Sequence, residues 1–129
     1  MVGLNAALQK RFILPPENRL VTGEVHRARA VQVGVGGKGQ DVAITLSCLQ
    51  FTGNLKLAHF IGSGAEGNLV YEMLHDLLGE DAMELTVRTA GGMRTCTSIV
   101  ASDTTTELVE PSDTIGESEM NQLLEQLSQ

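Results

Sequence analysis

The stretch from Val35 to Ala43 has residue types and a spacing suited to binding an anion. Gly36, Gly37 and Gly39 carry no Cβ atom, so backbone N–H groups there can come close to a ligand. The helix expected next adds the positive end of its dipole, and Lys38 supplies a mobile positive charge. The stretch indicates a site for a phosphate or a sugar. A tight strand-to-helix turn is the alternative interpretation, and the spacing is neither a Walker A loop nor a dinucleotide fingerprint.

Two strand, turn and helix units are expected to position this loop. Apolar residues follow helical spacing over residues 40–49 and again over residues 68–78, which ends at Gly79. Between these helices, Leu55–Ile61 is a mostly apolar run typical of a parallel strand, and it leads into a glycine-rich turn over residues 62–67. The repetition predicts an α/β fold, in which ligands bind where strands end and helices begin.

The remaining segments favour short strands and one more helix. Strands are predicted for residues 2–4, 12–14 and 21–35, and antiparallel strands, forming a small sheet beside the main one, for residues 84–89, 96–101 and 104–109. Gly116 with Glu119 three residues later predicts a capped helix near the end of the chain. His59 lies in an apolar run and is predicted to be a hydrogen-bonded core histidine rather than a metal ligand.

Length, charge and cysteine spacing indicate which binding partners and which cell compartment to expect. With 129 residues the chain has the length of one domain, and its net charge of −7 argues against a nucleic-acid partner. No apolar run approaches the ~20 residues that cross a membrane, and the N-terminus lacks the design of a signal peptide. Cys48 and Cys96 lie in no metal or redox spacing. We therefore expect an intracellular protein, most simply cytoplasmic, with an organelle left open.

Several blocks occur in an order that resembles a known family. They are residues 4–10 (LNAALQK), 23–28 (GEVHRA), 36–43 (GGKGQDVA), 60–62 (FIG), 92–95 (GMRT) and 106–111 (TELVEP). In this order they are similar to the N-terminal half of the PfkB (ribokinase-like) carbohydrate kinases, in the branch of 1-phosphofructokinase and tagatose-6-phosphate kinase. The resemblance covers essentially the whole chain.

The resemblance implies both a fold and an activity. The fold would be a doubly wound parallel α/β sheet with a small β-sheet lid, its strands within about residues 10–35 and 84–110, truncated before the ATP-binding half. The complete enzyme would use ATP and Mg²⁺ to phosphorylate a sugar or a sugar phosphate. This chain would supply the substrate-binding half, and a homodimer could form through the lid strands. The catalytic base is expected downstream of Gln129, so no catalytic residue and no metal ligand is assigned.

The resemblance also assigns substrate-binding residues. Gly37, Lys38 and Gly39 would approach the sugar or its phosphate, and Arg94 would be the second cation on a phosphate, since its planar fork suits that group. In such chemistry protein groups mainly position the reactants and stabilise charge.

Two further candidate residues depart from the family pattern. Gln9 stands where the family has an aspartate that binds sugar hydroxyls, and Asp41 stands where it has the asparagine of GGKGxN. Glutamine can donate and accept hydrogen bonds but brings no charge. A carboxylate at Asp41 would favour a sugar hydroxyl and repel a phosphate, or it could simply cap the helix. A non-catalytic sugar-binding or dimerisation module derived from the family is the alternative function.

Overall fold

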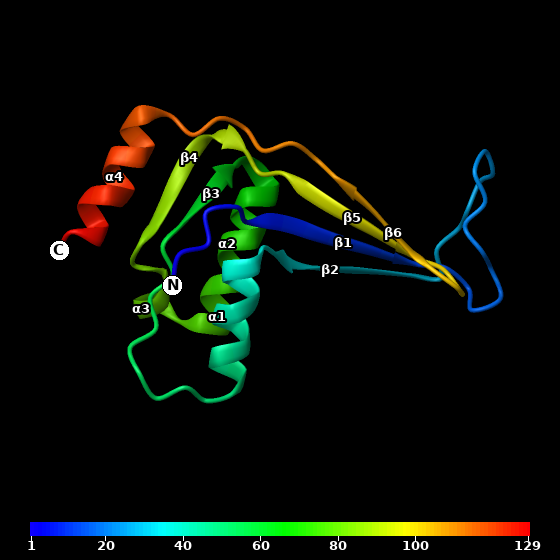
Figure 1. The fold of residues 1–129 in the computed structure, drawn as a ribbon, viewed down its shortest axis with the longest axis horizontal. Helices are drawn as coiled ribbons and strands as arrows, with labels where there is room; N and C mark the ends of the chain where they lie inside the picture. Colours follow the sequence, from blue (N-terminus) through cyan, green and yellow to red (C-terminus); the bar gives the residue numbers. More distant parts are fainter.

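The computed structural model describes all 129 residues as a layered α/β core from which a sheet extends (Figure 1). The core contains strands β3 (His59–Ser63) and β4 (Thr86–Gly92), which pair in parallel, and Val2 forms an isolated parallel bridge with Ala58. Helix α2 (Gly64–Leu78) and helix α4 (Glu117–Leu127) lie on opposite sides of these strands. The core therefore carries helices on both faces, as a doubly wound sheet does.

Alternating side chains of the core strands explain this layering. On one face Ile61 packs with Val70 and Leu74 of α2, and on the other Phe60 packs with Val87 and Leu123, the last from α4. All six side chains are buried. Burying apolar surface on both faces is the main stabilising term for such a layered core.

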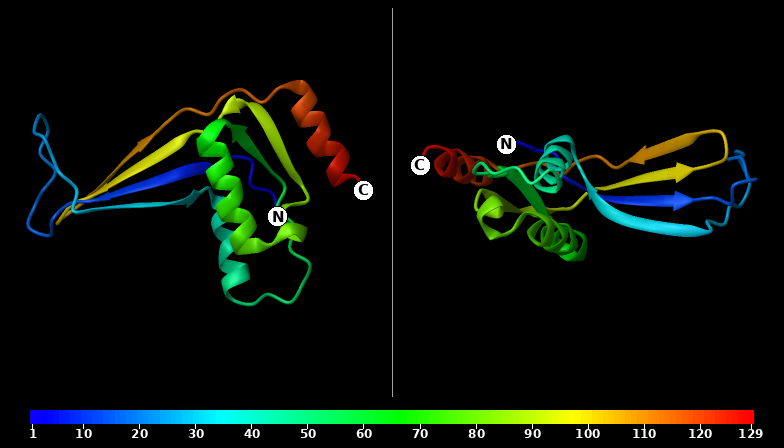
Figure 2. Two further views of the ribbon diagram at one scale, coloured as in Figure 1. Left: turned by 180° about the vertical axis from the view of Figure 1, so that it is seen from behind. Right: turned by 90° about the horizontal axis from the view of Figure 1, so that it is seen from below.

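The second sheet has four strands and extends away from the helices (Figure 2). In the order β2-β1-β5-β6, it contains β2 (Ala30–Gly36), β1 (Ala7–Ile13), β5 (Thr95–Val100) and β6 (Thr105–Val109). β1 is antiparallel to β2 and parallel to β5, and β5 is antiparallel to β6. Because β2 ends at Gly36, this sheet delivers the chain directly into the glycine loop.

The sequence predicts seven strands and the structure has six, and the pairing of one predicted strand differs from the prediction. The segment predicted as an antiparallel strand at 84–89 is β4, which pairs in parallel with β3 in the core. The strand predicted at 12–14 belongs to the longer β1, and only residues 30–36 of the predicted 21–35 strand form β2. Residues 2–4 form no strand and contribute only the isolated bridge of Val2 with Ala58. The strand predicted at 55–61 begins at His59 and reaches Ser63.

Two helices begin earlier than predicted, each within a glycine-rich segment. Helix α1 spans Lys38–Cys48, and α2 begins at Gly64 rather than Asn68. A short helix α3 (Glu80–Met83) follows Gly79 and was not predicted. The predicted cap of α4 is confirmed, since Glu119 accepts the Gly116 N–H at 2.6 Å and the Ala90 N–H of β4 at 2.7 Å. None of the helices is long and apolar enough to cross a membrane.

Candidate functional site

A cleft of about 430 Å³ lies where β2 passes into α1 and beside the start of β5. It is lined by five of the six residues predicted to bind substrate, namely Gly37, Lys38, Gly39, Asp41 and Arg94. The N-terminal segment from Val2 to Asn5 forms another wall. The structure thus brings together the glycine loop and an arginine that is distant in sequence, while the binding role of each residue stays a prediction.

Close backbone contacts shape the loop, and only glycine permits them. Gly37 is the N-cap of α1 and has φ 124°, a left-handed conformation that side chains disfavour. A Cβ on Gly39 would overlap Gly3, and one on Gly3 would lie 2.9 Å from the Cα of Gly39. The first turn of α1 therefore lies directly against the N-terminal segment.

The start of α1 offers unpaired backbone donors. The first intrahelical bond runs from the Asp41 N–H to the Gly37 carbonyl at 2.8 Å, so the N–H groups of residues 38–40 have no partner within the helix. α1 has 11 residues, and its aligned peptide dipoles favour negative charge at this end. The exposed Lys38 adds a full positive charge beside these donors.

Arg94 is held at the cleft by backbone carbonyls. Its Nε donates to the carbonyl of Ala6 at 3.3 Å, and its Nη2 donates to that of Asn5 at 3.0 Å. A guanidinium carries five N–H donors, so three remain for a ligand. Neutral carbonyl partners leave its positive charge uncompensated, which suits recognition of a phosphate.

Asp41 lies on the cleft wall but does not cap the helix. The N-cap position belongs to Gly37, and no side chain caps α1. The alternative of a capping role for Asp41 is therefore wrong, because α1 begins at Lys38 and Asp41 lies inside its first turn. Its exposed carboxylate is free to accept a hydrogen bond from a hydroxyl.

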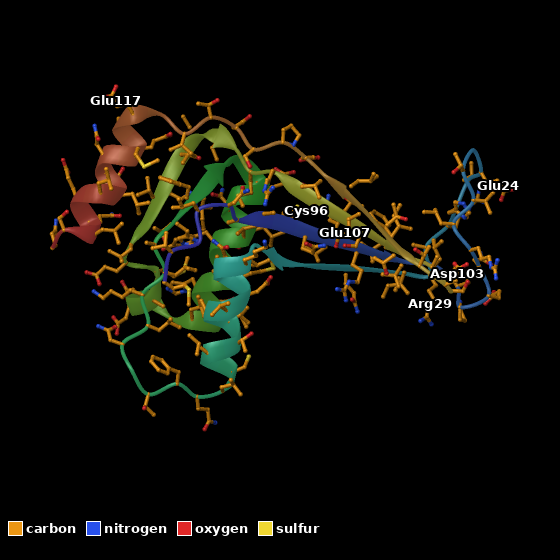
Figure 3. All side chains as sticks on the ribbon, in the orientation of Figure 1. Glu24, Arg29, Cys96, Asp103, Glu107 and Glu117 are labelled. Carbon is orange, nitrogen blue, oxygen red and sulfur yellow. The ribbon has the colours of Figure 1, made fainter.

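Gln9 does not line this cleft. On β1 its Nε2 donates to Ser98 Oγ of β5 at 2.8 Å, and Ser98 Oγ lies 3.3 Å from Glu107 Oε1 of β6. Glu107 lies on the extended sheet, away from the helices (Figure 3). The side chain of Gln9 occupies the space that a Cβ on Gly36 would need. Gln9 is therefore near the glycine loop, but its amide is engaged across the sheet.

Sequence reasoning missed the other residues that line the cleft, which are Val2, Gly3, Leu4, Asn5 and Gln40. Gly3 and Asn5 form its N-terminal wall, and Gln40 lies beneath the glycine loop. Asn5 stands in a block that carries the family resemblance, which could have identified it. Gln40 gives only a weak signal, a polar residue placed immediately after the glycines.

A buried histidine lies behind Gln40. His59 of β3 is fully buried and hydrogen-bonded to its neighbours, as predicted from the apolar run around it. Burial lowers the pKa of His59 from 6.5 to about 4, because the charged imidazolium loses its hydration. The ring is therefore neutral at pH 7. The structure contains no group of three or more His, Cys, Asp or Glu side chains arranged to hold a metal ion.

Solved structures of sugar kinases share this architecture. Phosphofructokinase-2 of Escherichia coli, in complex with substrates and products, matches 98% of the chain with 24% identity and a TM-score of 0.83. A protein described as a possible 1-phosphofructokinase of Thermotoga maritima matches 96% with 25% identity and a TM-score of 0.69. Ribokinase of Thermotoga maritima matches 85% with 20% identity and a TM-score of 0.65.

These likenesses confirm the predicted ribokinase-like fold and the resemblance to the phosphofructokinases. The chain spans only 39%, 38% and 35% of the length of those three proteins, respectively. No family model matches the chain, and no curated protein matches it.

Proposed function

We propose that this chain, which has the ribokinase-like fold of the phosphofructokinases, binds the acceptor sugar phosphate of an ATP-dependent carbohydrate kinase. The observation that carries the proposal is the meeting of Lys38, Arg94 and the open N-terminus of α1 in one cleft. Two full positive charges and a helix dipole favour a phosphate dianion. Asp41 supplies an acceptor for a sugar hydroxyl on the same wall.

The chain's own residues would bind and orient the acceptor. Lys38 and Arg94 would hold the phosphate, and the backbone around Gly37 would lie against the sugar. Holding an acceptor hydroxyl in a fixed position lowers the barrier of phosphoryl transfer, since that chemistry depends mainly on positioning and charge stabilisation. ATP and Mg²⁺ belong to the complete enzyme, and we assign no residue of this chain to them.

Titration calorimetry with fructose 6-phosphate, free fructose and inorganic phosphate tests the proposal. Lys38→Ala and Arg94→Ala should each weaken fructose 6-phosphate binding about 10- to 100-fold, the loss expected for one charge-assisted contact. Arg19→Ala removes the same charge at a distant exposed ion pair with Asp103 and should leave the affinity unchanged. Absence of sugar-phosphate binding to the unaltered chain, or equal effects of all three variants, would contradict the proposal.

We also propose that two copies of this chain pair through one face of the four-stranded sheet. The strand register places Phe12, Val31 and Ile99 side by side on that face, with Val33 and Leu108 further along it. Val31, Val33 and Leu108 are 53%, 48% and 60% exposed. Lys10 and Thr97 lie between Val33 and Leu108 on this face, so polar residues border the apolar ones. The opposite face carries the polar residues Arg11, Gln32, Ser98 and Glu107 at its centre, with Val109 near one end. Exposed apolar patches rimmed by polar residues mark protein interfaces.

Sedimentation of two matched variants tests the pairing. Val33→Glu places a charge on the apolar face and should shift the chain from dimer to monomer, since burying an unpaired carboxylate is costly. Gln32→Glu adds the same charge on the opposite face of the same strand and should leave the dimer intact. A monomeric unaltered chain would contradict this interface.

A further inference from the structure

Gln40 is a fully buried polar side chain at the third position of α1, directly beneath the cleft. Its Nε2 donates to the carbonyl of Gly3 at 2.6 Å and lies 3.2 Å from His59 Nδ1. These partners fix the orientation of the amide, because a flipped amide would set its oxygen against the Gly3 carbonyl oxygen. Gln40 therefore ties the first turn of α1 to the N-terminal wall of the cleft and to strand β3.

The hydrogen-bonded chain continues into the core sheet. An amide nitrogen can only donate, so His59 Nδ1 must accept, and the ring proton must be on Nε2. His59 Nε2 lies 2.8 Å from Thr86 Oγ1 of β4 and donates to it. One chain of polar groups thus runs from Gly3, through Gln40 and His59, to Thr86.

One atom of this chain has no partner. Gln40 Oε1 is buried and accepts no hydrogen bond, which is uncommon for a buried side-chain oxygen and calls for an explanation. This oxygen faces the N-cap residue, since a Cβ on Gly37 would overlap it. Glutamine at this helix position often accepts the N–H of the N-cap residue, yet here that bond is not made. The free oxygen therefore lies against the residue that shapes the cleft.

We propose that Gln40 is a positioning residue of the acceptor cleft: its anchored amide supports the Gly37 turn from below and transmits ligand binding to the buried ring of His59. The inference rests on the proposed function, because the ligand is taken to be a sugar phosphate. A ligand that engages the turn changes the polarity around Gln40 Oε1. Because the same amide donates to His59 Nδ1, that change reaches the imidazole.

Binding to a Gln40→Met variant tests the support of the turn. Methionine keeps the length of the side chain and removes both polar ends. Fructose 6-phosphate should bind about tenfold more weakly, whereas inorganic phosphate, held mainly by Lys38 and Arg94, should change by about twofold or less. Val70→Ala, which removes two buried methyl groups from a core residue of α2, lowers stability without touching the cleft and should leave both affinities unchanged.

The ¹⁵N resonance of His59 Nδ1 gives a readout that a purely structural role would not move. Fructose 6-phosphate should shift this resonance in the unaltered chain, although His59 is fully buried, and should not shift it in Gln40→Met. If the unaltered chain binds the sugar phosphate but Gln40→Met binds it equally well, or the resonance stays still, Gln40 has no such role. If the unaltered chain binds neither probe, the proposed function itself fails. If Gln40→Met does not fold, the His59 resonance of the unaltered chain still tests the proposal, because an unchanged resonance on sugar-phosphate binding contradicts it.

Discussion

The cleft at α1 and the four-stranded sheet fix their polar groups in different ways. Around the cleft, Gly3 and Gly39 approach so closely that neither tolerates a Cβ, and Gln40 is buried beneath them. On the sheet, Gln9, Ser98 and Glu107 bond to one another across three strands, and the apolar face beyond them is exposed. Close backbone packing therefore shapes the cleft, while on the sheet side-chain hydrogen bonds between strands hold the polar groups. Substitutions should be costly in the first region and tolerated in the second.

The largest expected effect comes from adding one methyl group to each region. Gly39→Ala places a Cβ against the backbone of Gly3, so the N-terminal wall must move, and the free energy of unfolding should fall by about 3 kcal/mol. Gly34→Ala on β2 meets no atom within 4 Å and should raise stability by up to about 1 kcal/mol. Urea unfolding followed by circular dichroism measures both variants. Equal losses would remove the contrast between the two regions.

The second-largest expected effect is the pH dependence of stability that arises from His59, which lies behind the cleft. The pKa of His59 is about 4 in the folded chain and near 6.5 when unfolded, so the unfolded state binds more protons between these values. His59 therefore contributes stability that is complete above pH 6.5 and is lost as the pH falls toward 4. Between pH 7 and pH 5 the loss should be about 2 kcal/mol. Urea titrations at several pH values measure the slope.

Two histidine variants separate this effect from general acid sensitivity. His59→Leu should abolish most of the slope between pH 7 and pH 5, because no buried imidazole then resists protonation. His75→Ala alters an exposed ring on α2 and should keep the slope of the unaltered chain. A steep slope that survives His59→Leu would show that other groups set the acid sensitivity of the core.

Periodicity predicted the layers of this fold better than its pairings. Apolar spacing located α1, α2 and α4, because each buries one face. The glycines gave a wrong prediction in one segment, where Gly62 and Gly67 were expected to form a turn. Instead Gly67 lies inside α2, and any Cβ there would overlap the Gly62 carbonyl. The same glycine can signal a bend or a close approach, and only the tertiary structure distinguishes them.

The residues of the candidate site also divide into those that the sequence predicted and those that only the tertiary structure reveals. Motif order predicted the glycine loop and Arg94, which the fold brings into one cleft. Gln40 was missed because its importance depends on Gly3 and His59, which are distant in sequence and meet it only in the folded chain. Gln9 was predicted from its place in the family pattern, but sequence could not show that Ser98 of a different strand would engage its amide.

The smallest expected effect is on the sheet, at Gln9. Gln9→Ala removes one hydrogen bond, and Ser98 keeps its bond to Glu107, so the loss of stability should be about 1 kcal/mol. Because the amide of Gln9 is engaged by Ser98 outside the cleft, calorimetry should find the affinity for fructose 6-phosphate within about twofold of the unaltered chain. Gln9 stands where the family binds sugar hydroxyls, so a tenfold loss would mean that its amide leaves Ser98 for the sugar when the acceptor binds. The sheet would then be part of the site, and the contrast with the cleft would hold only for the free chain.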